Sequence, residues 1–210
     1  SDLLLRSLSL RREQRIEVVA LDPQVEGAAG RVAARGAAEL AAMKYRDRDL
    51  NILTLGEFLD LAAGRGPLLV EIKSDFTTPD ERFLKKIADH AAAYRGPLAL
   101  MSFDPGVMAR MAELAPSVPR GIVSGVYSGP DWHIERIGME RAARLTDLLE
   151  SGPARVSFYA YHVKALPRAV PRYARDVQGL PLFTWTVRTA EDRKVAKEWA
   201  DAAIFEGDAP

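Results

Sequence analysis

Cysteine is absent from the 210 residues, which excludes disulfide bonds, thiolate metal sites and thiol nucleophiles and fits a reducing, cytoplasmic compartment. An excess of either charge is also absent, because 29 Lys and Arg residues balance 29 Asp and Glu residues. No overall field therefore attracts nucleic acid or an anionic membrane. No apolar run approaches the roughly 18 residues of a membrane span, and residues 1–20 lack the apolar core of a signal peptide. Nucleic-acid binding and stable membrane insertion are accordingly not expected.

Apolar residues are plentiful, at 48% of the chain, which is enough for a sizeable core in one domain. From Thr54 onward, strand-like and helix-like segments alternate, a pattern typical of parallel strands joined by right-handed helical crossovers. Two further strand-like segments, Leu3–Leu8 and Ile16–Ala20, precede them. We therefore expect residues 1–210 to form a single α/β domain built on a TIM (β/α)8-type barrel.

The alternating region predicts strands and helices with definite boundaries. The expected strands are 68–73, 97–102, 121–124, 155–160, 181–187 and 202–205. The expected helices are 54–61, 78–94, 105–114, 138–150, 166–178 and 190–200. Thr54 with Glu57 predicts a capping box, and Asp104 before Pro105 predicts another helix start. Residues 125–137 are expected to form a loop.

The segment Leu68–Ser74 is the most informative part of the sequence. Its apolar residues Leu68–Val70 suit a strand buried on both faces, as in a parallel sheet. Glu71 and Lys73 lie two residues apart, so they project from the same side at the end of that strand. The carboxyl ends of parallel strands are where α/β barrels carry their chemistry. The pair therefore marks either a functional site or an ordinary strand-end ion pair.

Other segments occur in the same order and at the same spacing as in a known family. They are Asn51–Leu59, Glu71–Lys73, Ser102–Asp104, Trp185–Val187 and Ala203–Gly207. Together they resemble the glycerophosphodiester phosphodiesterase family, from about Val18 to Pro210. The resemblance implies a metal-dependent phosphodiester hydrolase of lipid metabolism, which cleaves a glycerophosphodiester to glycerol 3-phosphate and an alcohol.

The resemblance also implies roles for four residues of this chain. Glu71 matches a metal ligand, and Lys73 matches the lysine that meets the substrate phosphate. Asp2 is the candidate for a second ligand, with a solvated terminal Asp as the alternative. Trp185 is a candidate pocket wall against the glycerol or head group, with barrel filling as the alternative. Because hard oxygen ligands suit Ca²⁺ or Mg²⁺, either ion is the expected cofactor.

Two parts of the family's pattern are missing from the 210 residues: a strand ending in His-Arg-Gly and a helix opening with Glu-Asn-Thr. Such a barrel would be incomplete at the N-terminus and would leave two unpaired edges. Residues preceding Ser1, a strand from a partner chain, or a remodelled segment 1–20 would each explain the gap, and we favour the first. In addition, Leu21 stands beside Asp22 where the family has a proton-transferring histidine, and a leucine cannot transfer a proton.

Histidine is scarce, with three in the chain. His90 lies within an expected helix and is assigned to the surface or to packing. His133 and His162 follow expected strands, at the edge where a ligand would bind, although a packing role is the simpler interpretation of each. Neither matches a catalytic histidine of the resembled family, so the catalytic acid and base are left unassigned.

Three more charged residues, Arg120, Arg188 and Glu206, lie at the ends of expected strands. The arginines are candidates for contact with an anionic substrate. Glu206 takes the place of an Asp that many members of the resembled family carry before their final Pro. Solvation of these strand ends is the simpler interpretation.

Two functions from different classes remain open. The first is a phosphodiesterase whose substrate is a small phosphodiester. The second is a catalytically degenerate relative that binds a phosphate-bearing ligand or a protein partner, because losing both histidines would remove about two orders of magnitude or more from each proton-transfer step. The sequence leaves the head group, the identity of the ion and an oligomeric state open.

Overall fold

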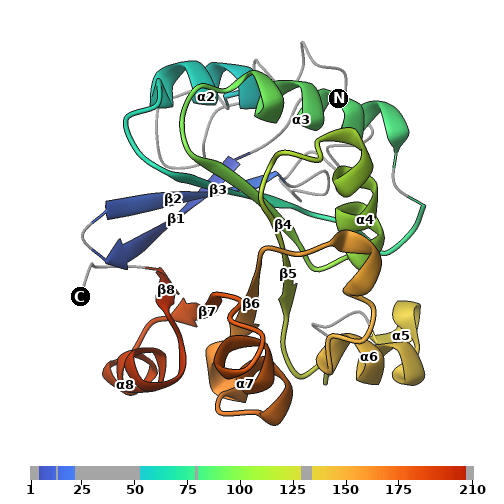
Figure 1. The fold of residues 1–210 in the computed structure, drawn as a ribbon, viewed down its shortest axis with the longest axis vertical. Helices are drawn as coiled ribbons and strands as arrows, with labels where there is room; N and C mark the ends of the chain where they lie inside the picture. Colours follow the sequence, from blue (N-terminus) through green and yellow to red (C-terminus); the bar gives the residue numbers. More distant parts are fainter. Residues whose placement is uncertain (1–4, 13, 22–52, 79, 129–133, 207–210) are drawn as a thin grey trace, which may run out of the picture.

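The computed structural model describes residues 5–12, 14–21, 53–78, 80–128 and 134–206. Within these ranges, eight strands follow one another in chain order around a closed barrel (Figure 1). Each neighbouring pair from β2 to β8 is parallel, whereas β1 is antiparallel to both β2 and β8. The expected α/β barrel is therefore confirmed, with one strand reversed.

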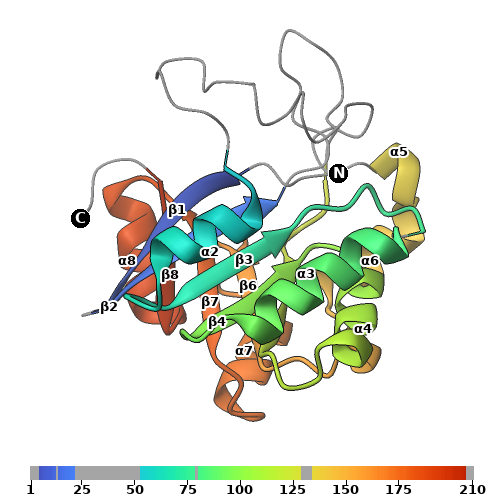
Figure 2. The same cartoon turned by 90° about the horizontal axis from the view of Figure 1, so that it is seen from above.

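The strands are β1 Leu5–Arg12, β2 Gln14–Leu21, β3 Leu68–Ile72, β4 Leu98–Ser102, β5 Arg120–Ser124, β6 Phe158–His162, β7 Leu182–Val187 and β8 Ala202–Phe205. The helices are α2 Leu55–Ala62, α3 Glu81–Ala93, α4 Pro105–Leu114, α5 Ile134–Ile137, α6 Met139–Thr146, α7 Ala169–Asp176 and α8 Ala190–Trp199. They lie outside the strands, with α2 and α3 along the outer side of β3 (Figure 2). Among the described helices, none combines the length and the apolar character that crossing a bilayer requires.

The first two strands form a hairpin, and each of them is longer than the strand that the sequence predicted. Leu5 pairs with Leu21, and Arg12 pairs with Gln14. On its other side β1 pairs with β8, where Ser9 lies opposite Phe205. A fully parallel barrel would have a parallel strand between β2 and β8, and this barrel lacks that strand. In the structure the position is filled from within the chain, by β1 of the hairpin.

The barrel has two apolar layers, one inside and one between strands and helices. The inner layer consists of Leu69, Met101, Val123, Phe158, Ala160 and Ile204, with Phe103, Phe183 and Trp185 packed against it. On β3 the neighbouring residues Leu68, Val70 and Ile72 belong to the outer layer instead. All five residues of β3 are buried, so the prediction of a strand buried on both faces is confirmed.

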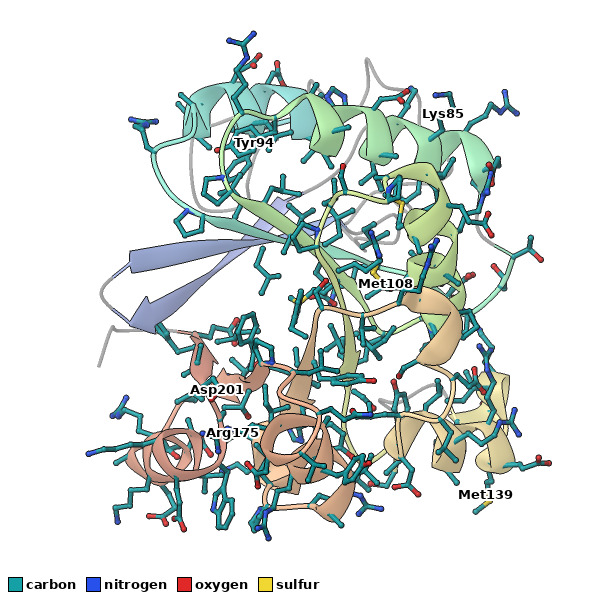
Figure 3. All side chains as sticks on the ribbon, viewed as in Figure 1. Lys85, Tyr94, Met108, Met139, Arg175 and Asp201 are labelled. Carbon is teal, nitrogen blue, oxygen red and sulfur yellow. The ribbon has the colours of Figure 1, made fainter. Side chains whose placement is uncertain are left out.

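Local sequence signals place most helix starts correctly. Thr54 and Glu57 form the predicted capping box of α2, and the Asp104 side chain accepts a hydrogen bond from the Gly106 N–H at the start of α4. Helix α3 begins at Glu81, with Asp80 as its N-cap, later than predicted. Lys85 of α3 lies on the outer surface and extends away from the barrel (Figure 3).

Two further segments differ from the prediction in ways that have a clear cause. The expected strand 155–160 lies at Phe158–His162, because Gly152–Ala154 form a 3-10 turn and Arg155 follows it with a φ of 47°. A residue in that left-handed conformation cannot continue into a strand. The expected loop 125–137 contains one helical turn, Ile134–Ile137, at its end.

Candidate functional site

Glu71 and Lys73 lie at the carboxyl end of β3, as the sequence predicted. Glu71 is the fourth of five strand residues and is 5% exposed, on the same side of the strand as Leu69 of the inner layer. The Lys73 Nζ lies 2.6 Å from the Glu71 Oε1, and the Lys73 side chain is 35% exposed. A buried carboxylate thus holds a partly exposed ammonium at the opening of the barrel.

One aromatic ring lies beside the ammonium, and a second ring packs against the first. The Lys73 Nζ is 5.6 Å from the centre of the Phe103 ring, which follows β4. The Phe103 and Trp185 rings meet edge to face, with their centres 5.1 Å apart. Trp185 comes from β7 and donates its indole N–H to the Ala160 carbonyl across 3.1 Å. Phe103 therefore links the ion pair to the Trp185 ring.

His162, the last residue of β6, extends the group. Its ring centre lies 4.8 Å from that of Trp185, its partner in the β6–β7 register. Burial lowers the pKa of His162, and the positive charge of Lys164 lowers it further, against the opposing effect of Asp192. Burial and the charge of Lys164 therefore favour the neutral imidazole. We call Glu71, Lys73, Phe103, His162 and Trp185 the mouth cluster.

Comparison of this chain with known sequences finds no relative, whereas comparison with solved structures does. No family model and no curated protein matches the sequence. Solved structures do match. A phosphodiesterase from Oleispira antarctica, in complex with the product sn-glycerol-3-phosphate, has a TM-score of 0.60 at 16% identity, over 90% of this chain and 75% of that one. The glycerophosphodiester phosphodiesterase from Parabacteroides distasonis has a TM-score of 0.58 at 16% identity, over 94% and 76%. This chain has the glycerophosphodiester phosphodiesterase fold.

A protein from Silicibacter pomeroyi, described as a glycerophosphoryl diester phosphodiesterase, agrees with this result. Its TM-score is 0.61 at 22% identity, over 90% of this chain and 75% of that one. The resemblance found in the sequence is thereby confirmed at the level of fold. At such identities the likeness concerns the path of the backbone and assigns no role to a side chain.

Several predicted residues lie elsewhere or outside the described ranges. Asp2, Asp22 and His133 fall outside them. Leu21 ends β2 and pairs with Ile72, so its backbone lies at the same end of the barrel as the mouth cluster. His90 is exposed on α3, as predicted.

The prediction for Arg120 is wrong. It is the first residue of β5, at the opposite end of the barrel, and is 5% exposed. Its guanidinium donates to the carbonyls of Ala115, Pro116 and Val118 at 3.1, 2.7 and 2.8 Å. Arg120 therefore stabilises the turn after α4 and is neither solvated nor near the mouth cluster.

Arg188 and Glu206 form an ion pair with each other. The Arg188 Nε donates to the Glu206 Oε2 across 3.0 Å, and both side chains are at least half exposed. Because both follow strands at the carboxyl end of the barrel, the pair lies at the rim. The simpler interpretation therefore applies to Arg188 and Glu206: both are solvated residues at strand ends.

The side chains of β7 do not keep the alternation of a regular strand. The alternation of a regular strand would put Phe183, Trp185 and Val187 on one face. Phe183 and Trp185 pack on the inner layer, but Val187 packs with Ala196 and Phe205 on the outer side. The register between β7 and β8 shifts between Thr184 and Val187, and such an irregularity changes which face a residue occupies.

The residues present can be tested against a cation site. Among the described residues, no three His, Asp or Glu side chains come together as candidate ligands. Calcium or magnesium needs several oxygen ligands, and Glu71 supplies one carboxylate that already pairs with Lys73. The described part of the chain alone does not form a cation site.

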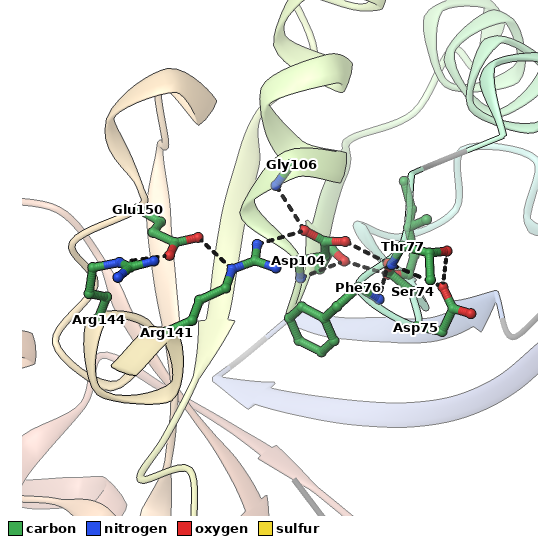
Figure 4. A network of polar contacts seen from close by, with 11 residues as sticks. Ser74, Asp75, Phe76, Thr77, Asp104, Gly106, Arg141, Arg144 and Glu150 are labelled. Atoms are coloured by element: carbon green, nitrogen blue, oxygen red, sulfur yellow. Dashed lines mark hydrogen bonds and ion pairs between the residues drawn. The ribbon is translucent and has the colours of Figure 1, made fainter. Parts of the chain in front are cut away.

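Ser74, Ser102 and Asp104 take part in the site although sequence reasoning gave them no role there. They form a chain of hydrogen bonds between the ends of β3 and β4 (Figure 4). The sequence does contain a signal for two of these residues. Ser102–Asp104 is one of the segments that carry the resemblance, and Asp104 is predicted as a helix cap. What the sequence could not give was the contact partner across the strands.

Proposed function

We propose that the chain is a phosphodiester hydrolase that acts on glycerophosphodiesters, through the mouth cluster. The observation that supports this most is the partly exposed Lys73 ammonium, held by the buried Glu71 at the carboxyl end of the strands. The Phe103 ring lies beside this ammonium, and Trp185 packs against Phe103. An ammonium has three N–H donors, and Glu71 takes one of them. The others can bind phosphate oxygens.

Three members of the cluster have a direct task in binding the substrate in this proposal. Lys73 binds the phosphate as a compact cation. Trp185 and Phe103 offer apolar surface to the carbon atoms of the glycerol or of the head group. The Oleispira antarctica protein, solved with sn-glycerol-3-phosphate, supports a small phosphate-bearing ligand for this fold. A cytoplasmic location and a part in lipid metabolism belong to the same proposal.

The cation of the proposal is Ca²⁺ or Mg²⁺, held by Glu71 together with Asp2. If the ion binds, it should raise the melting temperature by mass action, because it binds the folded state and neutralises clustered carboxylates. A Glu71→Gln variant should stay folded and lose most of that shift. The measurement is a thermal melt with and without each ion. An equal shift in wild type and variant would reduce Glu71 to a strand-end ion pair.

A second candidate function is favoured by Leu21, whose backbone lies beside the mouth cluster where a proton-transferring residue was expected. In this case the chain keeps the barrel and binds a phosphate-bearing ligand or a protein partner without turnover. Phosphate binding at Lys73 is required by the hydrolase and by a relative that binds a phosphate-bearing ligand, and only the hydrolase requires turnover.

We expect weak or absent turnover of glycerophosphocholine by the 210-residue chain, together with saturable binding of glycerol 3-phosphate. The reason is that each missing proton-transfer group costs about two orders of magnitude in rate or more. Choline release measures the first quantity and isothermal titration calorimetry the second. Rapid turnover would mean that another acid–base pair operates, with His162 and His133 as the first candidates. Absence of binding would reject the hydrolase and the phosphate-binding relative, and would leave binding of a protein partner as the second function.

A further inference from the structure

The residues on both sides of Lys73 are held by side chains at the end of β4, one through its backbone carbonyl and the other through its side chain. Before it, the Ser102 hydroxyl donates to the Ile72 carbonyl across 2.6 Å. After it, the Ser74 hydroxyl donates to the Asp104 Oδ2, also across 2.6 Å. Lys73 is thus the one residue between two fixed points, both supplied by the segment Ser102–Asp104.

Asp104 is itself held from several directions (Figure 4). It is 3% exposed, and its other oxygen, Oδ1, accepts the Gly106 N–H of α4 across 2.9 Å. Its own N–H donates to the Ser102 hydroxyl across 3.1 Å. Arg141 of α6 adds a more distant positive charge, 3.9 Å from Oδ1. A hydrogen bond to such a fixed, ionised acceptor is stronger than one between neutral groups.

The segment that follows Lys73 is held as well. The Phe76 N–H donates to the Ser74 hydroxyl across 3.0 Å, so this hydroxyl both donates and accepts. Arg136 of α5 donates to the Asp75 carbonyl across 3.0 Å. The Arg141 guanidinium lies 5.7 Å from the centre of the Phe76 ring. Ser74 is therefore the link through which this loop and Asp104 act on the position next to Lys73.

We infer that the Ser74–Asp104 hydrogen bond is a positioning contact for the phosphate site, which fixes the backbone beside Lys73 so that its ammonium lies at the barrel opening before a ligand arrives. The inference rests on the proposed binding of phosphate by Lys73. Neither Ser74 nor Asp104 touches the ligand in this scheme. Their effect is on affinity, because a side chain that is ordered in advance loses less entropy when it binds.

The test is the affinity of the full chain for glycerol 3-phosphate, measured by isothermal titration calorimetry on Ser74→Ala. We expect about a fivefold loss, the size of one ordinary hydrogen bond. The conservative variant Ser74→Thr keeps the hydroxyl and should bind like wild type. The matched control is Ser124→Ala, since Ser124 also ends a strand at this side of the barrel and its buried hydroxyl donates to the Leu145 carbonyl across 2.7 Å. That control should bind like wild type.

A double mutant separates positioning from general structural damage. If Ser74 acts through Lys73, Ser74→Ala should cause no further loss when it is added to Lys73→Met. Unchanged binding by Ser74→Ala, equal losses in Ser74→Ala and Ser124→Ala, or a full extra loss in the Lys73→Met background would each overturn the inference. Those results leave the proposed function standing, whereas a wild-type chain that does not bind glycerol 3-phosphate overturns both.

Discussion

Replacement of Gly121 by alanine is expected to lower the free energy of unfolding by about 1–3 kcal/mol, the usual cost of overfilling a core. Gly121 of β5 pairs with Phe158 of β6, whose ring lies in the inner layer. A Cβ at position 121 would lie 2.3 Å from the Phe158 Cε2 and 2.5 Å from two more ring atoms. The ring is 4% exposed and enclosed by neighbours, so it cannot move aside freely. Urea denaturation followed by circular dichroism measures the loss.

Gly152→Ala is the control for this experiment. Nothing lies within 4 Å of a Cβ at that position, so little change is expected. Combining Gly121→Ala with Phe158→Leu should cost less than the sum of the two single changes, because the smaller side chain relieves the overlap. If Gly121→Ala unfolded like Gly152→Ala, the close packing of Phe158 against β5 would be refuted.

Replacement of Lys73 by methionine is expected to weaken the binding of glycerol 3-phosphate by at least about tenfold, because it removes charge-assisted hydrogen bonds worth about 1.5–3 kcal/mol. Calorimetric titration measures this loss. The same change leaves the carboxylate of Glu71, 5% exposed, without its Lys73 partner, so the melting temperature should fall too.

A second substitution separates these two effects. Adding Glu71→Gln to Lys73→Met removes the unpaired charge and should restore part of the melting temperature without restoring binding. Lys85→Met is the control for loss of a lysine, since Lys85 pairs only with the exposed Asp89 on the surface of α3. Binding by Lys73→Met that equals wild type would show that the phosphate lies elsewhere.

The parts of the fold that sequence predicts well are those set by neighbouring residues. The cap of α2 depends on Thr54 and Glu57, three positions apart, and the burial of β3 depends on one apolar run. The position of Glu71 and Lys73 at a strand end follows from the same local pattern. These features need no knowledge of the rest of the chain.

The parts that failed depend on contacts between distant segments. The outward side chain of Val187 results from a register shift between β7 and β8, which no pattern within β7 reveals. In the sequence, Arg120 resembles a solvated strand end. In the structure, its guanidinium donates to three carbonyls of the preceding turn. Likewise, the contact of Phe103 with Trp185 joins two strands that are far apart in sequence, so the aromatic side of the site appears only in three dimensions.

The reversed strand β1 has a consequence for the order of events as the chain is synthesised. Leu10 of β1 pairs with Ile204 of β8, so the ring of strands cannot close until β8 has left the ribosome. Until then one edge of β1 would be open to pairing with other chains. Its other edge is occupied early, because all eight of its residues pair with β2 in a local hairpin. Closing the remaining seam links distant residues and is therefore the step most exposed to misassembly in a crowded cell.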